Sequence, residues 1–127
     1  AGNTYAVGGF TGTVDFDPAG GTYNLSTSLG HIKQDAFIQK LDPTGNLLWV
    51  KRFGGSTDAT QYCSKIKIGA NGDVFVTGRY LDDIQFTQTG TLWSAGPAAT
   101  NPRSFMVKLN SQGVVQWGYG WKHDGND

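Results

Sequence analysis

The residues that most often act as a general base or a nucleophile are scarce in this sequence. It has two histidines, His31 and His123, and one cysteine, Cys63. No nucleophile elbow, HExxH motif or phosphate-binding loop surrounds any of them. We therefore predict no catalytic residues, no cofactor and no enzyme activity, and we interpret Cys63 as a small buried residue on a strand.

Asp15 and Asp17 form the strongest candidate pair of metal ligands. They flank Phe16, so on a strand both carboxylates would face one side and could reach a hard cation such as calcium. Two ligands are too few for a calcium site, and no Asp-rich loop with a closing Glu follows. We therefore predict no metal site; instead, Asp17-Pro18 should start a turn that Asp15 caps through backbone hydrogen bonds.

Composition narrows the class of protein that must position these residues. The 127 residues carry ten Lys or Arg against ten Asp or Glu, so charge gives no reason to expect nucleic acid or an anionic membrane as a partner. No apolar run is long enough to insert into a bilayer, and no signal peptide is present, so any export signal would lie upstream or have been removed. Nineteen glycines and 13% aromatics indicate short strands joined by tight turns, hence an all-β fold.

An internal repeat organises the chain. Residues 2–10 align with 72–80, and residues 14–16 align with 84–86, both at an offset of 70. Residues 37–42 then align with 105–110, and Trp49 with Trp117, at an offset of 68. The two lost residues fall in the Gly-, Pro- and Ala-rich stretches 17–21 and 95–99, which we expect to be surface loops.

Three loops predict hairpins. Residues 42–46 separate strands expected at 37–41 and 47–53, and residues 110–113 separate strands expected at 105–109 and 114–119. Both loops have Asp or Asn first and Gly fourth, as in a type I turn followed by a left-handed residue. The third loop, 69–72, joins strands expected at 63–68 and 73–80, so a full unit is four strands in an antiparallel meander.

Side-chain patterns predict how two of these strands are covered. Val74-Phe75-Val76 is apolar at consecutive positions, which is typical of a strand covered on both faces. Residues 65–68 alternate Lys with Ile, which favours a strand with one wet face.

The tryptophans divide into two groups. Trp49 and Trp117 recur at equivalent positions, so we interpret both as core between stacked units. Trp93 and Trp121 have no tryptophan equivalent and are the candidates for a ligand surface, where indoles stack on sugar rings. Asn24-Leu25-Ser26 matches a glycosylation sequon, although matches of this length are frequent by chance.

Four-stranded units repeated with glycine and aromatic landmarks are typical of a β-propeller. The segments VGGFTGTVDFDP (7–18), KLDPTGNLLW (40–49) and FGG (53–55) resemble the SBBP family of bacterial β-propeller repeats, and the resemblance covers nearly the whole chain. It implies an exported or surface-attached setting and a binding role without a defined ligand. The second copy departs from the pattern, because DFDP becomes QFTQ (85–88) and FGG becomes WKH (121–123).

The repeat divides the chain unevenly. We expect the last three strands of one blade in residues 1–55, four strands of a second blade in 56–120, and the start of a connection to a further blade in 121–127. Propellers close with roughly four to eight blades. We therefore expect further blades as partners, supplied by the same longer chain or, alternatively, by identical subunits assembled into a ring.

These observations lead to one functional hypothesis with two alternatives. The leading hypothesis is a non-catalytic β-propeller module of an extracellular or cell-surface bacterial protein that binds a protein or another ligand. The alternatives are a structural spacer or assembly module in a large repeat protein, and a glycan-binding, lectin-like propeller. No residue pattern identifies the ligand.

Overall fold

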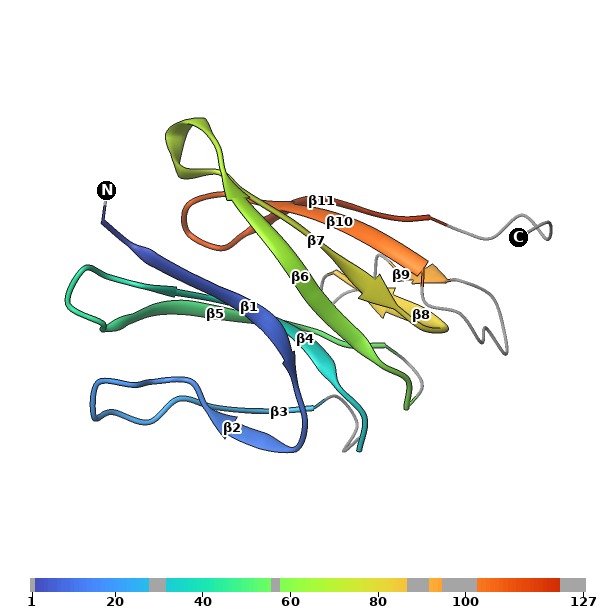
Figure 1. Cartoon of the computed structure of the whole chain (residues 1–127), viewed down its shortest axis with the longest axis horizontal. Coiled ribbons are helices and arrows are strands. Elements are labelled where there is room, and N and C mark those ends of the chain that lie inside the picture. Colours follow the sequence, from blue (N-terminus) through green and yellow to red (C-terminus); the bar gives the residue numbers. More distant parts are fainter. Residues whose placement is uncertain (1, 28–31, 56–57, 87–91, 95–102, 122–127) are drawn as a thin grey trace.

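The computed structural model describes residues 2–27, 32–55, 58–86, 92–94 and 103–121, with backbone alone at 92–94. Two antiparallel sheets dominate this part of the chain (Figure 1). The first has the order β1-β4-β5, with bounds Thr4–Phe10, Asp35–Leu41 and Leu47–Phe53. The second has the order β11-β10-β7-β6, with β6 Gln61–Ile68, β7 Val74–Tyr80, β10 Arg103–Leu109 and β11 Val115–Gly120.

The all-β antiparallel class predicted from the sequence is therefore confirmed, as are the three hairpins β4–β5, β6–β7 and β10–β11. The first sheet has three strands and the second has four in meander order. The described residues do not close into a barrel or a propeller ring. None of their helical segments is long and apolar enough to cross a membrane.

Each sheet carries a small extra hairpin that the sequence did not predict. β2 (Thr13–Asp15) pairs with β3 (Asn24–Ser26), and β8 (Asp83–Gln85) pairs with β9 (Leu92–Ser94). The β2–β3 hairpin lies between β1 and β4 along the chain, and the β8–β9 hairpin lies between β7 and β10. The expected loop 17–21 joins β2 to β3 and is largely exposed, whereas 95–99 lies outside the described residues.

The turns follow the predicted chemistry. Gly45 and Gly113 have φ values of 89° and 82°, which a residue with a Cβ adopts only at a cost. Their N–H groups donate to the carbonyls of Asp42 and Asn110 at 3.0 Å in both turns. Loop 69–72 differs, because a short 3-10 turn (Ala70–Gly72) places Asn71 as well as Gly72 at positive φ.

The main core lies between the two sheets. It unites three side chains of the first sheet with buried residues of the second sheet and of the β8–β9 hairpin. The members from the first sheet are Ala36, Ile38 and Phe53; the principal members from the second sheet are Val74, Val76, Tyr80, Phe105, Val107 and Leu109, and those from the β8–β9 hairpin are Ile84 and Phe86. Because strand residues alternate between faces, one face of each sheet supplies this core.

A cluster of three aromatic rings occurs once in each unit. Phe16 lies 5.2 Å from Phe10 and 5.0 Å from Phe37 between ring centroids, beneath the β2–β3 hairpin. The repeat aligns this cluster with Tyr80, Phe86 and Phe105, where the Phe86 and Phe105 centroids are 5.6 Å apart and those of Tyr80 and Phe105 are 6.4 Å apart.

These two clusters establish how the units are stacked. The second cluster belongs to the core between the sheets, whereas the first lies in a separate core on the opposite face of the first sheet. Figure 1 shows the β2–β3 hairpin on one side of the first sheet and the four-stranded sheet on the other. The two units therefore face the same way, front to back, rather than back to back.

The prediction that Val74-Phe75-Val76 is covered on both faces is confirmed for one face only. Val74 and Val76 are fully buried against the first sheet, but Phe75 on the opposite face is only half-buried. The described residues place no second layer over that face. By contrast, Lys65 and Lys67 of β6 are exposed while Ile66 packs on the core, as the alternating pattern predicted, but Ile68 at the end of the strand is 40% exposed.

Candidate functional site

The most specific polar contact between the sheets is made at the β10–β11 turn. Lys40 Nζ and Trp49 Nε1 both donate to the backbone carbonyl oxygen of Ser111, at 2.9 and 3.0 Å. Lys40 lies on β4 and Trp49 on β5, where the register places them opposite each other. We call this arrangement the lysine–tryptophan clamp; it fixes the first sheet onto one turn of the second.

Shape complementarity accompanies the clamp. A Cβ atom built on Gly113 would lie 2.7 Å from Cδ2 of Trp49, closer than real carbon atoms approach. Gly113 therefore leaves the space that the indole occupies. The Lys40 ammonium also lies 5.7 Å from the centre of the Tyr5 ring, which is within cation–π range. Lys40 is only 8% exposed, so its charge is held by these partners rather than by water.

The outer face of the second sheet repeats the donor side of this arrangement. The repeat places Lys108 at the equivalent of Lys40 and Trp117 at the equivalent of Trp49, again opposite each other. Lys108 Nζ lies 5.5 Å from the Phe75 ring centre and 3.5 Å from an Asp73 carboxylate oxygen.

Aromatic side chains extend this face along β11. The centroids of Trp117 and Phe75 are 6.4 Å apart, and those of Trp117 and Tyr119 are 5.5 Å apart. Tyr119 and Trp121 are 55% and 53% exposed, so much of their apolar area faces water. This row of aromatic side chains is therefore the candidate interaction surface of the second sheet.

A groove of about 590 Å³ runs between the β5 edge, the β2–β3 hairpin and the β10–β11 turn. Its walls include Tyr23, Leu25 and Val114, with Lys51 and Arg52 as cationic groups. Arg52 already donates to the carbonyl of Ser26 at 2.7 Å. Chemically, the groove combines apolar walls with positive charge.

Three polar residues are buried where β4, β6 and β8 begin. Asp35 and Gln61 are fully buried and Asp83 is 6% exposed. Asp35 pairs with Arg52 at 3.7 Å, and Gln61 Nε2 donates to the carbonyl of Asp83 at 3.0 Å. Sequence reasoning missed this group, because no motif or spacing distinguishes these residues from polar strand ends.

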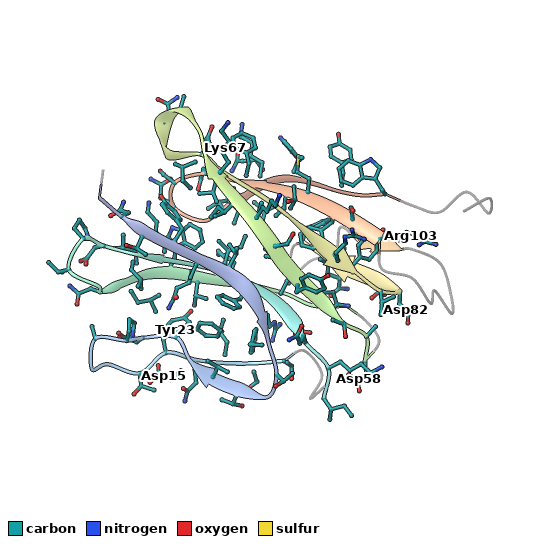
Figure 2. All side chains as sticks on the ribbon, viewed as in Figure 1. Asp15, Tyr23, Asp58, Lys67, Asp82 and Arg103 are labelled. Atoms are coloured by element: carbon teal, nitrogen blue, oxygen red, sulfur yellow. The ribbon has the colours of Figure 1, made fainter. Side chains whose placement is uncertain are left out.

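Asp15 and Asp17 act as turn residues, which confirms the interpretation made from the sequence. Asp15 Oδ1 accepts hydrogen bonds from the N–H groups of Asp17 and Tyr23, at 3.0 and 2.9 Å, and Figure 2 shows Asp15 beside Tyr23. These bonds lower the pKa of Asp15. Asp17 Oδ1 accepts from Ala19 N–H at 2.9 Å. Among the described residues, no group of three His, Cys, Asp or Glu is placed to hold a metal ion.

The other reactive residues singled out in the sequence are Cys63, His31 and His123. Cys63 is 3% exposed on β6, as predicted, and burial raises the pKa of its thiol, which makes it a poor nucleophile. His31 and His123 lie outside the described residues. The sequon Asn24-Leu25-Ser26 forms β3, with Asn24 and Ser26 exposed.

The tryptophans lie in different surroundings. Trp49 contacts the core between the sheets, as predicted. Trp117 was also interpreted as core between stacked units; it lies half-buried on the outer face of the second sheet, over which the described residues place no neighbouring unit, so that interpretation stays a prediction. Trp121 is exposed, as a ligand surface requires, and the side chain of Trp93 lies outside the described residues.

No protein-family model matches the sequence, and no curated protein matches it.

Proposed function

We propose that the chain is a non-catalytic module of β-propeller type that works by binding other macromolecules. The observation that carries the proposal is the front-to-back stacking of a three-stranded and a four-stranded unit, because units stacked in one sense can be continued by further units. The sequence resemblance to SBBP repeats supports the same architecture and supports an extracellular or cell-surface setting.

A binding role is supported by the chemistry of the surface. The outer face of the second sheet offers Trp117, Tyr119 and Trp121 to solvent or partners, and aromatic residues of this kind are enriched at binding sites. The nucleophile candidate Cys63 is buried with a raised pKa. The well-defined carboxylates Asp15 and Asp42 accept backbone hydrogen bonds in turns, which supports a structural role for both.

A screen for turnover tests the non-catalytic part of this proposal. The purified chain should release no product from fluorogenic esters, glycosides, phosphate esters and peptides. Turnover that co-purifies with the folded chain and disappears in an Asp35→Asn or Asp83→Asn variant would refute the proposal, because these are the buried carboxylates of the described structure.

Glycan binding is the second candidate, favoured by the exposure of Trp121 next to the aromatic row of β11. A glycan array probed with the wild type and with Trp121→Ala tests it. Binding that the variant loses, with an unchanged thermal unfolding midpoint, would support a lectin. An exposed control on another element, Ile32→Ala, should leave any glycan binding intact because Ile32 is 81% exposed and precedes β4.

A further inference from the structure

Both halves of the lysine–tryptophan clamp occur twice in this chain, but only one pair of halves is joined. The joined pair consists of the donors Lys40 and Trp49 and the acceptor turn at Ser111 and Gly113. Lys108 and Trp117 form a second donor half on the outer face of the second sheet. Among the described residues, the indole N–H of Trp117 has no acceptor.

The second donor half is already arranged like the first. In both units a lysine stands over an aromatic ring of the neighbouring strand, at 5.7 Å for Lys40 over Tyr5 and 5.5 Å for Lys108 over Phe75. The two lysines differ in two respects: Lys108 also forms an ion pair with Asp73 at 3.5 Å, and the two lysines are covered to different extents. Lys40 is buried beneath the second sheet, whereas Lys108 is only half-buried.

The second acceptor half is the β4–β5 turn. The offset of 68 residues places Pro43 at the position of Ser111 and Gly45 at that of Gly113. The two glycines have matching left-handed conformations. A Cβ on Gly113 would strike Trp49, but a Cβ on Gly45 would have no described atom within 4 Å. The space that an indole fills at Gly113 is therefore open at Gly45.

We propose that this chain binds a second copy of itself head to tail, with Lys108 Nζ and Trp117 Nε1 of one copy donating to the Pro43 carbonyl of the next. The indole of Trp117 then lies over Gly45, as Trp49 lies over Gly113. This proposal rests on the proposed function, since it extends the same stacking across two molecules.

The orientation of the units makes such a contact geometrically consistent. The donor half lies on the outer face of the second sheet, and the acceptor half belongs to the unit that carries the Phe10–Phe16–Phe37 cluster on the face turned away from the second sheet. A second copy that meets this face adopts the same front-to-back relation as the two sheets within one chain. Because donor and acceptor halves lie on different surfaces, the contact is heterologous and generates rings or filaments rather than a closed symmetric pair.

The surface around the donor half suits this occupant. The repeat aligns Trp121 with Phe53, which is 2% exposed and packs 5.8 Å from Phe86 across the joint within the chain. Trp121 is 53% exposed, so a second copy would cover an aromatic residue that the isolated chain leaves open.

Sedimentation velocity tests the proposal on the wild type and on two single variants. The wild type should sediment faster as its concentration rises from about 1 µM to about 1 mM. Trp117→Ala removes the donor indole, and Gly45→Asn fills the acceptor space with a residue that tolerates positive φ. Each variant alone should associate at least about tenfold more weakly than the wild type.

Mixing the two variants provides the decisive measurement. Gly45→Asn keeps the donor half and Trp117→Ala keeps the acceptor half, so an equimolar mixture should form a heterodimer and nothing larger. Trp117→Phe keeps an aromatic ring but loses the N–H donor, so it should associate about fivefold more weakly than the wild type. This variant is the control for the case in which Trp117→Ala fails to fold.

Three results would overturn the proposal: a wild type that stays monomeric to about 1 mM, association unchanged in Trp117→Ala and Trp117→Phe, or a variant mixture that forms no heterodimer. The proposed function fails separately. A nuclear Overhauser contact between the Trp49 indole and Ser111 or Gly113 reports the stacking within one chain, and its absence would remove the basis of the proposed function whatever the oligomeric state.

Discussion

Alanine at Gly113 and alanine at Gly45 should have unequal effects on stability, although the two turns share their conformation. Both glycines have positive φ, at 82° and 89°. The surroundings differ, because an added Cβ at Gly113 would lie 2.7 Å from Cδ2 and 3.0 Å from Cε2 of Trp49, whereas an added Cβ at Gly45 would meet no described atom within 4 Å. Gly45→Ala is therefore a matched control for the backbone cost alone.

The magnitudes follow from two contributions. Forcing a residue with a Cβ into the left-handed region costs about 1–2 kcal/mol, and both variants incur this cost. Overpacking a filled site costs about 1–3 kcal/mol more, and only Gly113→Ala incurs it. Gly113→Ala should thus lower the free energy of unfolding by about 1–3 kcal/mol more than Gly45→Ala does.

Urea unfolding followed by circular dichroism measures both values, at micromolar concentration so that association between copies does not contribute. The same pair of glycine substitutions in a Trp49→Val background completes a double-mutant cycle, in which the difference should largely disappear. Equal destabilisation by the two variants in the Trp49 background would refute the view that the indole is packed on the β10–β11 turn.

Three further predictions concern single residues. Hydrogen bonds from Asn46 and Thr44 lower the pKa of Asp42 to about 2, so the ionised Asp42 stabilises the fold above the unfolded pKa near 3.9, and this stabilisation is lost as the pH falls toward 2. Asp42→Asn, which gives this turn the residue found at Asn110, should therefore reduce the fall of the unfolding midpoint at acid pH. An unchanged fall would contradict this explanation. Cys63 should react with a thiol reagent only at the rate of unfolding, because burial raises its pKa and excludes the reagent; rapid reaction in the native state would show that β6 opens locally. Phe86→Ala should lower the free energy of unfolding, measured in urea, by about 3–5 kcal/mol, because Phe86 is 3% exposed and packs between Phe53 and Phe105. A decrease below about 1 kcal/mol would place the β8–β9 hairpin outside the core.

The strands and their order could be predicted because turn chemistry and the internal repeat are local signals. The loops at 42–46 and 110–113 predict hairpins from Asp or Asn and Gly alone, and the structure has those hairpins. The small β2–β3 and β8–β9 hairpins escaped prediction, because three-residue strands leave too short an alternating pattern to recognise.

The candidate site was harder to predict, because it depends on which face of a sheet is covered. Trp49 and Trp117 are equivalent in sequence, yet one contacts a neighbouring turn and the other lies half-buried on an outer face. Periodicity assigns both to the same side of their strands but does not say what lies opposite. The acceptor of the clamp is a backbone carbonyl, which leaves no trace in residue types.

The use of a backbone carbonyl as acceptor also bears on how repeats of this kind can diverge. Lys40 and Trp49 contact the main chain at Ser111, and the corresponding position in the other turn is Pro43, a residue of quite different chemistry. A main-chain acceptor is present whatever residue mutation puts there, provided that the turn keeps its shape. Selection would then act on the glycine, the lysine and the tryptophan, while the tip of each turn is free to vary and to acquire new specificities without loosening the stack.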